Sequence, residues 1–240
     1  MGNYLTQYID RRLYPLAHEP CKTQFSAIGG HPCAVVDLGF PTQQAIVFVH
    51  GNESTLQDVQ KEPQLVRLAQ RTRARVVGVS YPNYPGTGLP CDAIGAQLDA
   101  AACRRLRDVV QALQMSHASV KLMGHSLGCG AVLQTLATFP RIDVDGVVLA
   151  APFTRLGDMF PIGLGWLAGD RWNNVRHLGT VRAPVQVFHG AQDEVIPLAH
   201  SRALHGDDVR VVEKGSHALS TLMPAITDAL CGVHDARTLV

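Results

Sequence analysis

The chain has 240 residues, of which 46% are hydrophobic and 17% charged, and its formal net charge is +1. This length and composition fit one globular domain with a sizeable core and do not fit a disordered chain. The charge is too small to attract nucleic acid, and no apolar stretch reaches the roughly 18 to 20 residues that span a bilayer.

Residues 1–23 are predicted to form an N-terminal arm. They begin Met-Gly-Asn-Tyr-Leu-Thr, which matches the acceptor pattern for N-myristoylation of Gly2 in a eukaryotic protein. Arg11 and Arg12, or a second acyl chain on Cys21, could strengthen attachment to a membrane surface, although they fit equally well as surface charge and a buried thiol. The alternative is an ordinary terminus in which Gly2 has no role.

The six cysteines include no C-x-x-C pair, so the sequence indicates neither a zinc site nor a redox motif, and we expect free buried thiols. Asp10, Arg11 and Arg12 interrupt the region where a signal peptide would have its apolar segment. A reducing, cytoplasmic location is therefore expected.

Residues 24–240 are predicted to form one α/β domain. Two short β-like runs, 24–28 and 33–38, are joined by Gly-Gly-His-Pro, which is typical of a hairpin turn and favours an antiparallel entry into the sheet. A fully apolar run at 45–49 predicts a buried strand, followed by a helix over 59–73.

The segment His50-Gly51-Asn52 lies at the carboxyl end of the strand predicted at 45–49. Ligands of an open parallel sheet bind at this edge. The backbone N–H of Asn52, freed by Gly51, is therefore a candidate donor to an anion. The alternative is a tight turn with no further role.

A strand predicted at 75–80 runs into a Pro- and Gly-rich loop that contains Tyr81 and Tyr84. We expect this loop to form a wall of the site, with Tyr81 contacting the substrate. The alternative is that both tyrosines only cover the end of the sheet. A long amphipathic helix is predicted over 92–115.

The next apolar run, 120–123, ends in Gly-His-Ser-Leu-Gly and passes directly into a predicted helix over 129–139. This context is that of a nucleophile elbow, in which a serine lies on a sharp turn from strand to helix, and glycines on either side let neighbouring backbone approach. Ser126 is therefore the candidate nucleophile. The N–H of Leu127 is the candidate second donor to an oxyanion.

An apolar insertion at 153–172 lies between strands predicted at 144–150 and 185–188. We expect it to form a short cap over the site, with Phe153, Phe160 and Trp166 contacting an acyl chain. The alternative is a helix packed on the core.

Two further candidates follow strands near the end of the chain. Asp193 follows the strand at 185–188, and His217 follows a strand predicted at 209–212, ahead of a closing helix at 219–230. Histidine has an unperturbed pKa of about 6.5, which suits it to take the proton of a serine hydroxyl. His217 is thus the predicted base and Asp193 the carboxylate that orients it.

Other residues of the same types have to be weighed. Asp158 is an alternative acid, whereas His50 and His189 end buried strands, where a hydrogen-bonded structural histidine is usual. His125 lies inside the elbow and is expected to point away from Ser126.

The chain order Ser, Asp, His resembles that of the α/β-hydrolase superfamily, over roughly residues 24–230. The segments His-Gly-Asn-Glu, Gly-His-Ser-Leu-Gly and Gly-Ser-His are most similar to the small abhydrolase-domain proteins, which include protein depalmitoylases and lipid-ester hydrolases. The resemblance implies an α/β fold with a mostly parallel sheet, an antiparallel N-terminal hairpin, helices on both faces and a minimal lid.

The predicted function is a serine hydrolase that cleaves a carboxylic ester or thioester of a small-molecule or acylated substrate, without a metal or organic cofactor. A serine peptidase or amidase would use the same three residues and is the first alternative. A non-catalytic binding protein of the same fold is the second, and the intact set of Ser126, Asp193 and His217 argues against it.

Overall fold

A computed structural model of the chain describes residues 25–36, 39, 41–52, 54–87, 94–160 and 168–232. These residues contain an eight-stranded sheet of order β1-β2-β4-β3-β5-β6-β7-β8. The neighbouring strands from β4 to β8 are parallel, and β2 is antiparallel to both β1 and β4. The predicted fold class is therefore confirmed. The strands are β1 (Ser26–Ile28), β2 (His31–Val36), β3 (Gln44–Val49), β4 (Arg75–Val79), β5 (Ser119–His125), β6 (Gly146–Ala150), β7 (Val185–Gly190) and β8 (Arg210–Val212).

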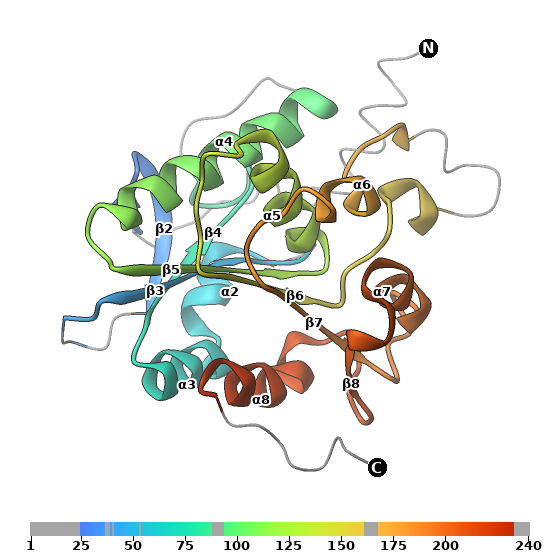
Figure 1. Cartoon of the computed structure of the whole chain (residues 1–240). Helices are drawn as coiled ribbons and strands as arrows, with labels where there is room; N and C mark the ends of the chain where they lie inside the picture. The colour runs from blue at the N-terminus through green and yellow to red at the C-terminus, as the bar shows by residue number, and fades with distance from the viewer. Residues whose placement is uncertain are drawn as a thin grey trace.

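Helices cover both faces of the sheet, with α4 and α5 on one face and α2, α3 and α8 on the other (Figure 1). Successive side chains of β3 alternate between the two cores: Val47 packs in the core beneath α4 and α5, and Ile46 and Phe48 pack in the other. The helices are α2 (Leu56–Lys61), α3 (Pro63–Thr72), α4 (Ala96–Gln114), α5 (Leu127–Thr138), α6 (Asn174–Leu178), α7 (Leu198–His205) and α8 (Leu219–Leu230), with 3₁₀ turns η1 (Leu156–Met159) and η3 (Gly206–Asp208).

The predicted N-terminal hairpin is present, but its turn is shorter than expected. Ile28 pairs with His31, so only Gly29 and Gly30 form the loop, and both have positive φ angles, 58° and 80°. A two-residue turn of this kind matches the twist of the strands it joins. His31 and Pro32 belong to β2 instead.

The single helix predicted over 59–73 is wrong, because the structure has two helices there. Pro63 has no N–H to continue α2 and disfavours helical angles at Glu62 before it. Glu62 ends α2 in an extended conformation, and its side chain accepts a hydrogen bond from the N–H of Gln64 to cap α3. The chain therefore changes direction at Glu62.

Cys33, Cys103 and Cys129 are buried free thiols, as predicted, whereas the free thiol of Cys231 is only partly buried. Burial raises the pKa of Cys33 and of Cys103 to about 12, so both stay protonated at neutral pH. Among the described residues, none of the helices combines the length and the apolar character needed to cross a bilayer. Gly2 and the rest of the N-terminal arm lie outside the described residues, and acylation of Gly2 stays a prediction.

Candidate active site

Ser126 lies on a strained turn between β5 and α5. Its φ of 52° and ψ of −117° are unusual for a residue with a side chain. A Cβ at Gly128 would lie 2.1 Å from the carbonyl oxygen of Val49, and a Cβ at Gly124 would lie 2.7 Å from the backbone nitrogen of Cys129. Both contacts are with backbone that cannot move aside, so the turn requires glycine at both positions.

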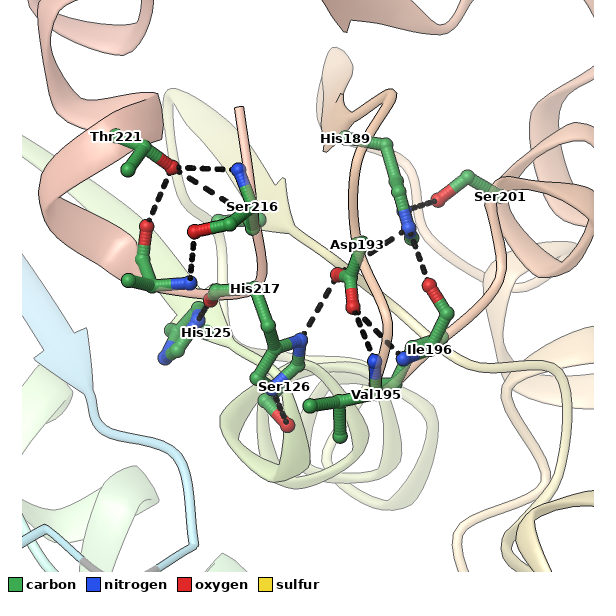
Figure 2. A network of polar contacts seen from close by, with 12 residues as sticks. His125, Ser126, His189, Asp193, Val195, Ile196, Ser201, Ser216, His217 and Thr221 are labelled. Atoms are coloured by element: carbon green, nitrogen blue, oxygen red, sulfur yellow. Dashed lines mark hydrogen bonds and ion pairs between the residues drawn. The ribbon is translucent and has the colours of Figure 1, made fainter. Parts of the chain in front are cut away.

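His217 bridges Ser126 and Asp193 (Figure 2). Its Nε2 lies 3.1 Å from Ser126 Oγ, and its Nδ1 lies 2.8 Å from Asp193 Oδ2. An ionised carboxylate only accepts hydrogen bonds, so Nδ1 carries the ring proton and Nε2 is left to accept the hydroxyl proton of Ser126. The three side chains therefore form a relay that can remove a proton from the serine.

The second carboxylate oxygen of Asp193 is held by its own loop. Asp193 Oδ1 accepts hydrogen bonds from the N–H groups of Val195, at 2.9 Å, and Ile196, at 2.8 Å, and the side chain is fully buried. Asp158, the alternative acid, instead accepts a hydrogen bond from the hydroxyl of Thr154. Asp193 is thus the carboxylate that contacts His217.

His189 supports the loop of Asp193 from beneath. Its Nε2 lies 2.8 Å from the carbonyl oxygen of Ile196 and 3.4 Å from Asp193 Oδ2, so this nitrogen carries the proton. Its Nδ1 then accepts a hydrogen bond from the buried hydroxyl of Ser201 at 2.6 Å. Burial lowers the pKa of His189, which favours this neutral form.

His125 points away from Ser126, toward the backbone of the neighbouring loop. Its Nε2 lies 2.9 Å from the carbonyl oxygen of His217, to which it donates. Burial, with a smaller contribution from the charge of His217, lowers the pKa of His125 to about 4, so the ring is neutral at pH 7. His125, which precedes Ser126, therefore anchors the backbone of His217, whose ring contacts Ser126.

The two predicted oxyanion donors lie on backbone next to Ser126. Leu127 is the first residue of α5, and an α-helix offers no intrahelical acceptor to the N–H of its first residue. Gly51, which precedes Asn52, packs against the serine, because a Cβ there would lie 3.2 Å from Ser126 Cβ. That these two N–H groups bind an oxyanion stays a prediction.

The structure contradicts two of the predicted substrate contacts. Tyr81 is only 1% exposed and donates its hydroxyl to the carbonyl oxygen of His50 at 2.6 Å, and Phe153 is 3% exposed in the core beside α5. Neither offers a surface to a ligand, so the structure gives both a packing role. Phe160 is partly buried against the same core, and Trp166 lies outside the described residues.

A cavity of about 150 Å³ borders the loop that carries Asn52. Apolar side chains such as Phe48 and Leu219 line it together with His125 and Gly51. Its lining includes His125, whose ring points away from Ser126, and none of Ser126, Asp193 and His217, so the cavity lies beside the reacting groups rather than at them.

The strand order and the serine elbow define an α/β-hydrolase fold. A model of the alpha/beta hydrolase family matches residues 46–177, more than half of the chain, and the chain therefore belongs to that family.

Similar proteins agree with this assignment. Human alpha/beta hydrolase domain-containing protein 17C is 27% identical over 188 residues, which cover 75% of this chain and 53% of that protein. The 17B protein of Xenopus tropicalis is 26% identical over 185 residues, covering 75% and 61%. The chain thus matches between about half and three fifths of the length of these relatives.

Solved structures show the same fold at lower identity. A monoacylglycerol lipase of Paleococcus ferrophilus superposes with a TM-score of 0.63 at 18% identity, covering 85% of this chain and 99% of that one. An esterase of Exiguobacterium antarcticum superposes with a TM-score of 0.61 at 18% identity, covering 88% and 98%. At this level of identity, the similarity shows the fold alone.

Proposed function

We propose that this protein is a serine hydrolase that cleaves a carboxylic ester or thioester through an acyl-enzyme on Ser126. The observation that carries the proposal is the relay from Ser126 Oγ through His217 to Asp193, with distances of 3.1 and 2.8 Å. A serine hydroxyl is a weak nucleophile at neutral pH, and an adjacent base that is itself oriented by a third group activates it.

Each step of the reaction has a group to perform it. Ser126 Oγ attacks the acyl carbon while His217 Nε2 takes its proton, and the N–H groups of Asn52 and Leu127 receive the charge that develops on the carbonyl oxygen. His217 then gives the proton to the departing alcohol or thiol, leaving the acyl group on Ser126. Water activated by His217 releases the acid and restores the serine.

The choice of an ester or thioester has two supports. Two solved structures with this fold are named as a monoacylglycerol lipase and an esterase. The motifs also resemble those of the small abhydrolase-domain proteins, whose members act on lipid esters and on protein-bound thioesters.

The test compares the wild type with Ser126→Ala, using a fluorophosphonate probe and p-nitrophenyl esters and acyl thioesters of graded length. We expect the variant to lose labelling and to lower turnover by about a million-fold, as removal of such a nucleophile does. Ser116→Ala is the control, because Ser116 is exposed and lies three residues before β5 begins, at the opposite edge of the sheet. Labelling that persists in Ser126→Ala would refute the assignment.

A further inference from the structure

We infer that His50 is a positioning residue that aims the N–H of Asn52 at the developing oxyanion. The inference rests on the proposed function and extends it to a residue that touches neither Ser126 nor, in the proposed mechanism, the substrate. Its basis is a hydrogen bond between the imidazole of His50 and the carbonyl oxygen of Gly51.

The hydrogen-bonded carbonyl belongs to the peptide unit that also contains the N–H of Asn52. His50 Nδ1 lies 2.8 Å from Gly51 O. A trans peptide is planar, so its C=O and N–H point in opposite directions, and fixing one of them fixes the other. Because Gly51 packs against Ser126, the direction of this peptide decides whether the N–H of Asn52 faces the oxygen of the reacting carbonyl group.

The surroundings of His50 give the ring one protonation state. The side chain is 1% exposed, and burial lowers the pKa of His50 to about 4, so the ring is neutral at pH 7. The carbonyl of Gly51 can only accept, so Nδ1 carries the proton. Nε2 is then an acceptor, and the hydroxyl of Ser80 donates to it at 2.7 Å.

Two tyrosines hold the same segment from the loop after β4. The hydroxyl of Tyr81 donates to the carbonyl oxygen of His50 at 2.6 Å, and the hydroxyl of Tyr84 donates to Asn52 Oδ1 at 3.3 Å. The rings of His50 and Tyr81 also meet edge to face, with centroids 5.2 Å apart. The loop after β4 thus holds the backbone of His50 and the side chain of Asn52, one on each side of Gly51.

Two amide substitutions separate this role from simple packing. In His50→Asn the side-chain amide can occupy the place of Nδ1 and still donate to Gly51 O, whereas in His50→Gln the amide reaches the place of Nε2 instead. We expect His50→Gln to lower kcat for p-nitrophenyl acetate by about 100- to 1000-fold with little change in KM, the effect of losing one oxyanion donor. His50→Asn should stay within about tenfold of the wild type.

A milder variant tests the neighbouring peptide, between His50 and Gly51, without removing the ring of His50. Tyr81→Phe deletes only the hydroxyl that holds the carbonyl of His50. We expect kcat to fall about fivefold, the effect of one net hydrogen bond, with the preference for acyl length unchanged. A changed preference with an unchanged kcat would mean that Tyr81 contacts the substrate, and would overturn the inference.

Thermal unfolding of each variant, measured alongside, distinguishes positioning from damage to the fold. Equal losses of kcat in His50→Asn and His50→Gln, or losses that follow the fraction of folded protein, would overturn the inference. If the wild type hydrolyses esters and His50→Gln keeps its kcat, only the role of His50 fails. If the wild type neither hydrolyses esters nor labels with fluorophosphonate, the proposed function fails and the inference fails with it.

Discussion

The nucleophile and its two partners are held in place by different physical means. The turn at Ser126 is fixed by backbone packed against backbone, at Gly124 and Gly128, where no side chain fits. The loops that carry Asp193 and His217 share such a contact, since a Cβ at Gly190 would meet the backbone of Gly215, but they are also held by hydrogen bonds from the side chains of His125 and His189. The elbow therefore depends on space, and the two loops depend in addition on the protonation of the histidines that hold them.

Histidines supply several of the hydrogen bonds at those loops. His125 donates to the carbonyl oxygen of His217, and His189 donates to that of Ile196 (Figure 2). The two loops also meet directly, since the N–H of Gln192 donates to the carbonyl oxygen of Gly215 at 2.8 Å. An imidazole that must stay neutral makes this region sensitive to acid, whereas a steric contact has no such dependence.

The largest effect is expected from adding one methyl group to the elbow. In Gly128→Ala the new Cβ would lie 2.1 Å from the carbonyl oxygen of Val49, so β3 and α5 would have to separate. We expect loss of the folded protein, a destabilisation above about 4 kcal/mol, measured by urea unfolding or as failure to obtain folded protein.

Gly179→Ala is the matched control for this substitution. Gly179 ends α6 with an ordinary φ of −63°, and the nearest atom to a Cβ there is 4.0 Å away. This change should leave stability unaltered or raise it by about 0.4 to 1 kcal/mol. If Gly128→Ala were as stable as Gly179→Ala, the elbow would not be fixed by packing, and the contrast drawn above would be wrong.

The difference between the elbow and the two loops also explains which parts of the site could be predicted from the sequence. The elbow is local: its apolar strand, its glycines and its helix are adjacent in the chain, so Ser126 could be placed from the sequence. The strand ends that carry Asp193 and His217 follow from the order of apolar runs. The contact between Asp193 and His217 could be proposed because few residue types can orient a histidine that acts as a base.

The supporting contacts could not be predicted in this way. The bonds from His125 to His217 and from Tyr81 to His50 each join a side chain to a backbone carbonyl. Every residue has that acceptor, so the sequence carries no sign of which carbonyl is used. The sequence places Tyr81 at the correct edge of the sheet but does not show which way its side chain points, and for this reason the predicted contact with the substrate is wrong.

Short helices also leave too weak a pattern in the sequence to be predicted. Helices α6, of five residues, and α7, of eight, were not predicted, because so few turns give almost no periodic signal. Their start signals exist nonetheless: the side chain of Asn173 caps α6 by accepting from the N–H of Arg176, and Pro197 precedes α7.

The next largest effect is expected from acid, because protonation of buried histidines should destabilise the folded protein. The pKa of His125 in the folded protein is about 4, below the value near 6.5 of an unfolded chain, and the same holds for His50. Between these pH values the unfolded chain binds more protons, so the free energy of unfolding falls as the pH falls from 6.5 to 4. At 1.36 kcal/mol per pKa unit, each histidine contributes a loss of about 3 kcal/mol.

Urea unfolding from pH 4 to 7 of the wild type and of His125→Gln checks this. The glutamine amide can still donate to the carbonyl oxygen of His217 but does not titrate, so the variant should lack about 3 kcal/mol of the wild-type pH dependence. Parallel curves for the two proteins would show that His125 is not held neutral by burial.

The smallest effect is expected at Ser201, one step further from the reaction. Its hydroxyl donates to His189 Nδ1 at 2.6 Å, which keeps the proton of His189 on Nε2, facing Ile196 O and Asp193. Ser201→Ala removes that donor and leaves a buried nitrogen without its partner. We expect a destabilisation of about 1 to 3 kcal/mol and a several-fold fall in kcat with KM nearly unchanged, since the loop of Asp193 loses its support but keeps its hydrogen bonds to Val195 and Ile196.

The chain offers a matched control for Ser201→Ala in a second serine–histidine pair. Ser116 Oγ lies 2.9 Å from His117 Nδ1 on the surface after α4 and also donates to the carbonyl oxygen of Leu113, so Ser116→Ala removes a serine–histidine contact far from Ser126. Water replaces the lost partner there, and neither kcat nor stability should change measurably. Steady-state kinetics and urea unfolding of the two variants form the comparison. Equal kinetics in both would mean that the backbone N–H groups of Val195 and Ile196 suffice to hold Asp193, and that His189 only fills space beneath the loop.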